Sequence, residues 1–116
     1  MEHSMKLKPE PFEKIRSGIK TIELRLYDEK RKKIAKKDII CFHNMENENE
    51  ILRAEVEEIY VFSSFEELYK NLPLLQCGYT KDTIASASPE DMTKYYSKEK
   101  QAEYGVTGIR LHLLEE

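Results

Sequence analysis

Three ionisable side chains stand close together in the run GIKTIELRL, residues 18–26: Lys20, Glu23 and Arg25. If the run is a β-strand, Glu23 and Arg25 share one face, because side chains two positions apart point the same way. Their backbones are then about 7 Å apart, so the carboxylate and the guanidinium can meet or can contact one ligand together. Arginine suits phosphates and planar acceptors, since its guanidinium donates paired hydrogen bonds. The pattern therefore indicates a site for a polar or anionic ligand.

Two other interpretations of this strand remain open. Glu23 and Arg25 can form the solvated face of a half-buried strand. They can also form an internal ion pair, in which the loss of one partner costs about 3–5 kcal/mol of stability. Lys20 is ambiguous: a regular strand places it on the aliphatic face, whereas the turn SGIKT can direct it toward Glu23.

A second candidate for binding is the segment 28–38, DEKRKKIAKKD, with six basic and three acidic side chains. Its positive excess contrasts with the formal net charge of −3 for the whole chain. Such a loop, with Lys32 and Lys33 among its cations, can contact a phosphate backbone with an affinity that falls as salt rises. Lysine runs are also common on solvated, mobile surface loops, and the sequence leaves both interpretations open.

The elements that must position these side chains follow from the periodicity and the capping residues. With 116 residues, 40% of them hydrophobic, the chain suffices for a single domain over 1–116 with its own core. We predict a helix in 9–18, strands at 20–27, 38–44, 51–62 and 106–114, and helices at 63–72 and 88–105, the last of which can bend and restart at Ser97. Gly108 inside the last strand indicates a bulge or a close backbone approach. Residues 1–5 are expected to be a flexible N-terminal extension without a role in the fold.

The order of these elements indicates the fold class. Strands outnumber the helices that can serve as crossovers, so a parallel, doubly wound sheet is disfavoured. We predict an α+β fold, a small and mostly antiparallel β-barrel or curled sheet with helices on its flanks.

Several classes of protein are disfavoured by composition. Cys41 and Cys77 lack the C-x-x-C spacing of a zinc site, and two cysteines do not make a disulfide scaffold. No cluster of metal ligands is apparent, and we predict neither a metal nor a cofactor. No apolar run approaches the roughly 20 residues of a membrane span, and no signal peptide is recognisable. We expect a soluble, cytoplasmic protein with free thiols, and the sequence does not indicate its oligomeric state.

The segments PEPFEKIRSGIKTIELRLYDEKR and YYSKEKQAEYGVTGIRL resemble the ASCH domain, a branch of the PUA-like superfamily. The resemblance extends from about Lys6 to the end of the chain. Its most specific part is the pattern G-x-K-x-x-E-x-R, which Gly18, Lys20, Glu23 and Arg25 match. The resemblance implies a small β-barrel with flanking helices, and a cleft at the motif that binds RNA or nucleotide-like ligands. It favours a functional cluster of these three charged residues.

The resemblance also leaves an enzymatic alternative open. Some small ASCH proteins hydrolyse the amide of N4-acetylcytidine with a lysine, a threonine three residues later and a more distant glutamate. Here the position three after Lys20 is Glu23, which has no hydroxyl, and Thr21 carries the nearest one. Other ASCH proteins resemble ribonucleases, and Lys20 with Glu23 suits acid–base work on a phosphodiester. The candidate catalytic residues are therefore Lys20, Thr21 and Glu23.

Three tyrosines near the predicted C-terminal helices are further candidates. Aromatic rings can stack on unpaired bases, but at helical spacing they more often pack against the protein. We predict packing for Tyr95 and leave Tyr96 and Tyr104 as candidates for the wall of a cleft.

Overall fold

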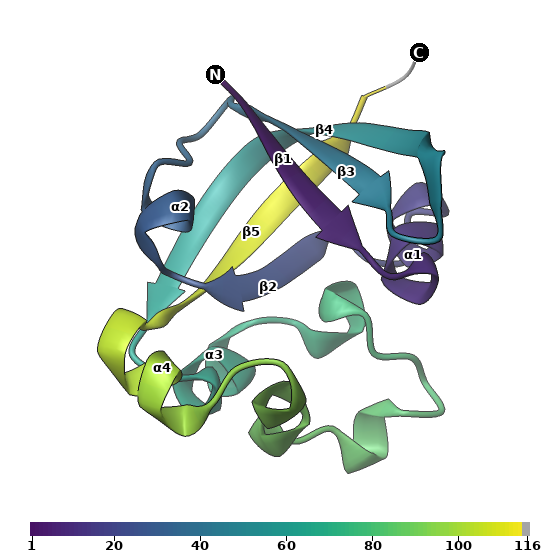
Figure 1. Cartoon of the computed structure of the whole chain (residues 1–116). Coiled ribbons are helices and arrows are strands. Elements are labelled where there is room, and N and C mark those ends of the chain that lie inside the picture. The colour runs from purple at the N-terminus through teal and green to yellow at the C-terminus, as the bar shows by residue number, and fades with distance from the viewer. Residues whose placement is uncertain (115–116) are drawn as a thin grey trace.

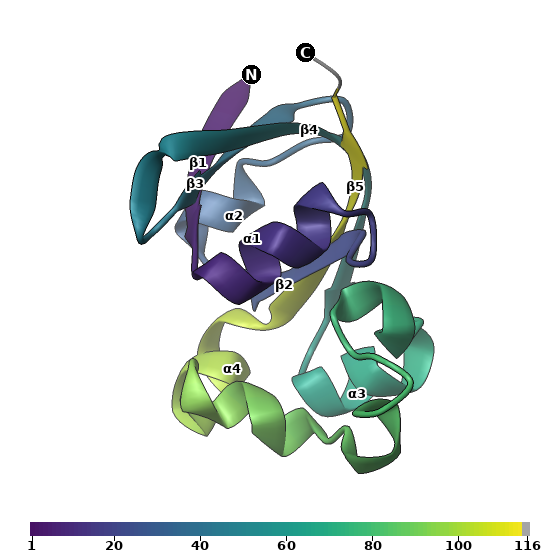
Figure 2. The same ribbon diagram turned by 90° about the vertical axis from the view of Figure 1, so that its right-hand side faces the viewer.

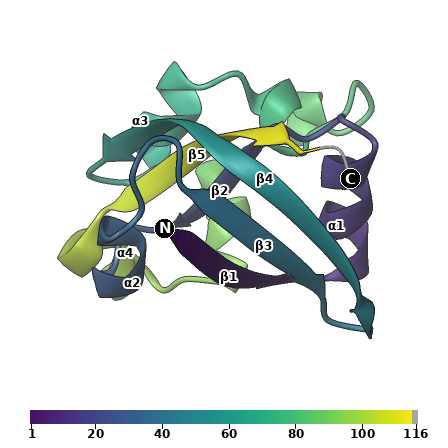
Figure 3. The same cartoon turned by 90° about the horizontal axis from the view of Figure 1, so that it is seen from above.

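The computed structural model describes residues 1–114, and its core is one sheet of five strands in the order β1-β3-β4-β5-β2. The strands are β1 (Glu2–Leu7), β2 (Ile22–Leu26), β3 (Ile39–Asn44), β4 (Asn47–Phe62) and β5 (Val106–Leu113). β1 pairs with β3 in parallel, and the other neighbours are antiparallel. The sheet curls into a half-barrel with β1 and β2 at its edges (Figure 1, Figure 3). This architecture confirms the predicted α+β class.

The helices lie outside this sheet. They are α1 (Pro9–Arg16), α2 (Glu29–Lys32), α3 (Phe65–Asn71), α4 (Lys98–Tyr104) and the 3₁₀ helices Leu74–Cys77, Ile84–Ser86 and Pro89–Lys94. α3 and α4 lie below the half-barrel and α1 lies beside it (Figure 2). The predicted helical segment 88–105 is divided at Ser97, where a restart was predicted: Ser97 caps α4 by accepting a hydrogen bond from the Lys100 N–H. α2 lies within the predicted loop 28–38.

The prediction that residues 1–5 lie outside the fold is wrong. β1 pairs with β3 along its whole length, and Met5 and Leu7 are buried in the core. The start of β1 is held at His3, whose Nε2 lies 2.8 Å from Oδ2 of Asp38. A strand with only two buried side chains gives a weak periodic signal, which explains why the sequence did not reveal it.

The register between β2 and β5 decides which way the charged side chains of β2 point. Glu23 is opposite Ile109, which belongs to the core inside the half-barrel. Leu24 is opposite Gly108 and packs in a second core with Leu72, next to α3. Directly paired residues share a face, so Glu23 faces the interior of the half-barrel.

Gly108 allows β5 and the end of α3 to lie close together. A Cβ atom at this position would lie 2.6 Å from Cδ1 of Leu72. This contact confirms the close approach that a glycine within a strand predicts.

Candidate functional site

Lys20, Glu23 and Arg25 converge into one buried cluster. The Glu23 carboxylate accepts from Lys20 Nζ through Oε1 and from Arg25 Nε through Oε2, both at 2.7 Å. Only 3% of Glu23 is exposed. Lys20 reaches this face because the chain turns before the strand begins: Gly18 has φ of 84°, and the Lys20 N–H donates to the carbonyl of Lys14. The structure thus contains the internal ion pair that the sequence left open, extended to a third residue.

The two cations keep Glu23 ionised. Burial alone would raise the pKa of Glu23, but Lys20 and Arg25 outweigh it and hold the pKa below its ordinary value. Burial likewise opposes the charge on Arg25, yet Glu23 raises the pKa of the guanidinium overall. The cluster therefore carries one negative and two positive charges at neutral pH.

Arg25 also links the two edges of the sheet. Its Nη2 donates to the carbonyl oxygen of Lys6 in β1 at 2.9 Å, while its Nε is held by Glu23. β1 and β2 are not neighbours in the sheet, so this side chain bridges the open side of the half-barrel. Since a guanidinium has five N–H groups, Arg25 keeps donors in excess of these two bonds.

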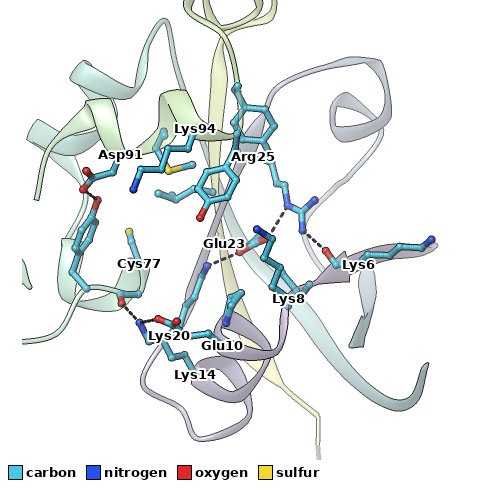
Figure 4. A pocket seen from close by; sticks show the side chains of 18 of the residues that line it. Lys6, Lys8, Glu10, Lys14, Lys20, Glu23, Arg25, Cys77, Asp91 and Lys94 are labelled. Atoms are coloured by element: carbon cyan, nitrogen blue, oxygen red, sulfur yellow. Dashed lines mark hydrogen bonds and ion pairs between the residues drawn. The ribbon is translucent and has the colours of Figure 1, made fainter. Parts of the chain in front are cut away.

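The cluster lies in the wall of a cavity of about 600 Å³ (Figure 4). The cavity lies between the open side of the half-barrel, α1 and the segment 69–96. The acidic and basic side chains that line it are those of Lys6, Lys8, Glu10, Lys14, Lys20, Glu23, Arg25, Asp91 and Lys94.

Cations outnumber carboxylates in this cavity by six to three. Lys14 is held by Glu10 at 3.2 Å and by the carbonyl of Gly78 at 2.8 Å. Lys8 and Lys94 are exposed and form no ion pair with any residue in 1–114. The cavity thus offers positive charge that the described part of the protein does not neutralise.

The wall formed by Tyr69, Tyr79 and Asp91 was not identified from the sequence. The Tyr79 hydroxyl donates to Asp91 Oδ2 at 2.6 Å, and the Tyr69 hydroxyl lies 2.7 Å from that of Tyr79. The sequence did carry one signal here, because Asp91 closes a capping box with Ser88 at the start of the 3₁₀ helix Pro89–Lys94. That signal locates a helix start, but not a cavity.

The prediction that Tyr95 packs is wrong, and of the two candidates for the cleft wall Tyr96 lines the cavity and Tyr104 does not. Tyr95, predicted to pack, is 61% exposed, lines the cavity and has Lys8 Nζ 5.6 Å from its ring centroid. Tyr96 lines the cavity and also stacks on Phe65, with ring centroids 6.1 Å apart. Tyr104 packs against the second core and is not among the cavity residues.

Other predicted site residues lie away from the cavity. Lys32 and Lys33 are exposed in and next to α2, on the side of the half-barrel opposite α1 (Figure 1). Lys32 pairs with Glu29 at 3.6 Å. The Thr21 hydroxyl donates to Oε1 of Gln76 at 3.2 Å, and Thr21 does not line the cavity.

Cys77 lines the same cavity as Lys20. Burial raises the pKa of its thiol to about 11, although Lys20 acts in the opposite direction. The thiol is therefore protonated at neutral pH and is a weak nucleophile.

The curled, mostly antiparallel sheet with flanking helices agrees with the fold that the resemblance to the ASCH domain implied. The ASCH domain family matches residues 5–115, and the chain belongs to this family.

Solved structures agree with this assignment. The crystal structure of hypothetical protein PH0355 has 32% identity and a TM-score of 0.81, over 98% of this chain and 100% of that one. The solution structure of protein PF0455 from Pyrococcus furiosus has 33% identity and a TM-score of 0.73, over the whole of both chains. An ASCH protein from Zymomonas mobilis, at 18% identity and a TM-score of 0.65 over 96% of this chain and 66% of that one, shares the fold. No curated protein matches the chain.

Among the helices of residues 1–114, none is long and apolar enough to cross a membrane.

Proposed function

We propose that this protein binds single-stranded RNA or a nucleotide-like ligand in the cavity beside Lys20, Glu23 and Arg25. The observation that carries the proposal is the convergence of these three side chains in the wall of a cavity with excess positive charge. Phosphate groups bind where cations gather, and an arginine fixed by a carboxylate is already oriented for them.

The size and the aromatic lining of the cavity support the same ligand. Ligand sites commonly have about 300–1,000 Å³, and this cavity, of about 600 Å³, suits a nucleotide unit better than a duplex. Tyr95 presents an exposed ring beside Lys8 at the cavity rim. Base stacking on such a ring contributes about 1–3 kcal/mol.

The test uses cations that take no part in the buried cluster. Lys8→Ala combined with Lys94→Ala removes two cavity cations, whereas Lys30→Ala combined with Lys33→Ala removes two exposed cations near α2. Both double variants change the net charge equally. We expect the cavity variant to bind a short single-stranded RNA more weakly, with a salt dependence reduced by about one unit of slope per lost phosphate contact.

Equal losses of affinity in the two double variants would contradict the proposal, because a cavity-specific contact would then be absent. Arg25→Ala is a weaker test, since it also breaks the bonds to Glu23 and to the Lys6 carbonyl and should destabilise the fold.

A second candidate function is hydrolysis of a modified nucleoside or of a phosphodiester. It is supported by the Lys20–Glu23 contact in the cavity wall, a pair suited to proton transfer. The N4-acetylcytidine reaction has less support, because Thr21 is hydrogen-bonded to Gln76 and not to Lys20. Assays of N4-acetylcytidine and of labelled RNA, with Lys20→Ala and Glu23→Gln as controls, test for turnover. Product that persists in both variants would exclude these two residues as its catalysts.

A further inference from the structure

Asp91 occupies a fixed position in the cavity wall, formed by local structure. It is the third residue of the 3₁₀ helix Pro89–Lys94, and its Oδ2 accepts from the backbone N–H of Ser88 at 3.2 Å. The same oxygen accepts from the Tyr79 hydroxyl at 2.6 Å. Two donors on one oxygen fix the plane and direction of the carboxylate.

The proton arrangement at this wall is also defined. Burial raises the pKa of Tyr79, and the hydrogen bond to Asp91 raises it further, so Tyr79 stays a phenol that donates to Asp91. Because Tyr79 has a single hydroxyl proton, Tyr69 donates to the Tyr79 oxygen. This chain of hydroxyls ends on Oδ2 and leaves Oδ1 without a donor among residues 1–114.

Asp91 differs from the other acidic residues of the cavity because it has no cation partner among residues 1–114. Glu10 pairs with Lys14, and Glu23 pairs with both Lys20 and Arg25. Asp91 forms no ion pair within the described residues, and its Oδ1 accepts from none of their donors, although six cations line the same cavity. A ligand that satisfies this wall must offer an N–H or O–H group of its own.

We propose that Asp91 Oδ1 accepts a hydrogen bond from the exocyclic amino group of a nucleobase, so that the cavity prefers amino-bearing bases over uracil. The proposal rests on the proposed function and specifies which ligand the cavity takes. Carboxylates accept from the N4 amino group of cytosine. Uracil presents its O4 acceptor at the same position, and two acceptors facing each other leave both unsatisfied.

Cytidine and uridine monophosphates are the matched probes, because their bases differ at this position and at the adjacent ring nitrogen, while the phosphate and sugar are the same. We expect the unmodified protein to bind CMP about tenfold more tightly than UMP, the discrimination of one good base contact. Binding is measured by calorimetry or by NMR titration at fixed salt.

Asp91→Asn converts the free acceptor into a donor with little change in shape. The side-chain oxygen of asparagine can still accept from Tyr79 and from the Ser88 N–H, which leaves the amide NH₂ at the position of Oδ1. We expect the variant to lose the preference for CMP and to favour UMP. Glu90→Gln alters an exposed carboxylate next to Asp91 that pairs with Lys98 and does not line the cavity. It is the control and should leave the CMP-to-UMP ratio unchanged.

The outcomes separate this inference from the function on which it rests. Equal binding of CMP and UMP by the unmodified protein overturns the role of Asp91 and leaves nucleotide binding intact; this comparison does not depend on any variant folding. A CMP-to-UMP affinity ratio that is the same in Asp91→Asn as in the unmodified protein also overturns the role of Asp91. If neither nucleotide binds and RNA does not bind either, the proposed function and the inference are both overturned.

Discussion

Glu23 is the residue on which the geometry of the site depends. It is buried, and each of its carboxylate oxygens contacts a different cation at 2.7 Å. An isolated buried charge would be strongly unfavourable, so Glu23 is tolerated because Lys20 and Arg25 neutralise it. In return the carboxylate fixes both cations in the cavity wall.

Replacing Glu23 with Gln should therefore destabilise the fold. Two partly buried cations would lose their counter-charge, and the breaking of a buried pair costs about 3–5 kcal/mol. Urea unfolding measures the loss. Glu46→Gln, at an exposed residue of the turn between β3 and β4, is the matched control and should change stability by less than about 0.5 kcal/mol.

The difference in stability between the parent and Glu23→Gln also depends on pH. The pKa of Glu23 is lowered in the folded protein, so its contribution is complete above the unfolded-state pKa of about 4.3 and is lost as pH falls through the folded value. The difference in stability between the parent and Glu23→Gln should shrink in acid. A stability difference that grows as pH falls would contradict the assignment of Glu23 as an ionised carboxylate.

At the residue scale, the sequence predicted which residues belong to the main cluster but not its full surroundings. The pattern G-x-K-x-x-E-x-R pointed to Lys20, Glu23 and Arg25, because strand alternation alone brings the last two together. Tyr79 and Asp91 line the cavity because of the way residues 74–94, with their three 3₁₀ helices, fold across it. The periodicity of apolar residues in the sequence does not predict that conformation.

At the scale of elements, β1 connects the N-terminus to the site. It supplies the Lys6 carbonyl that accepts from Arg25, and it leads directly into Lys8 and α1. Only two of its side chains, those of Met5 and Leu7, are buried. β1 therefore belongs to the fold through its pairing with β3, which its amino-acid composition does not indicate.

Met5→Ala tests whether β1 is part of the cooperative fold. Met5 is 3% exposed, and truncating a buried methionine to alanine typically costs about 2–5 kcal/mol. Thermal or urea unfolding measures the change, with Ser4→Ala at an exposed neighbour as the control. If Met5→Ala is as stable as the parent, β1 is not packed as described.

Other elements were predictable where local chemistry decides them. Pro9 at the start of α1 and Ser64 at the start of α3 follow ordinary capping rules. The long strand β4 was predicted from the alternation of its apolar and polar residues. The alternation changes phase after Val56, where the pairing with β5 shifts register between Val56 and Glu58. The 3₁₀ helix Pro89–Lys94 was predicted as part of a longer helix, because its capping box is shared by both helix types.

Over the whole molecule, two regions have an excess of cations, although the chain has a net charge of −3. One is the cavity, where six cations face three carboxylates. The other is the segment 28–38, which is held to the fold by the buried Ile34 and by pairs such as Lys36 with Glu58 at 3.0 Å. None of residues 28–38 lines the cavity, and α2 lies on the side of the half-barrel opposite α1 (Figure 1). The location of a bound ligand therefore distinguishes the two regions.

The fold class was predictable because the number and order of strands restrict the topology. The parallel pairing of β1 with β3 and the cap formed by the segment 69–96 depend on contacts between distant parts of the chain, which single-sequence patterns do not encode.

An NMR titration of the full chain with a short single-stranded RNA or a mononucleotide tests most directly whether the cavity is the binding site. Amide signals of residues 20–25, 77–79 and 91–96 should shift in a saturable manner, and those of 28–38 should change little. Saturable shifts confined to 28–38, or no shifts at any RNA concentration, would contradict the assignment of the cavity as the binding site.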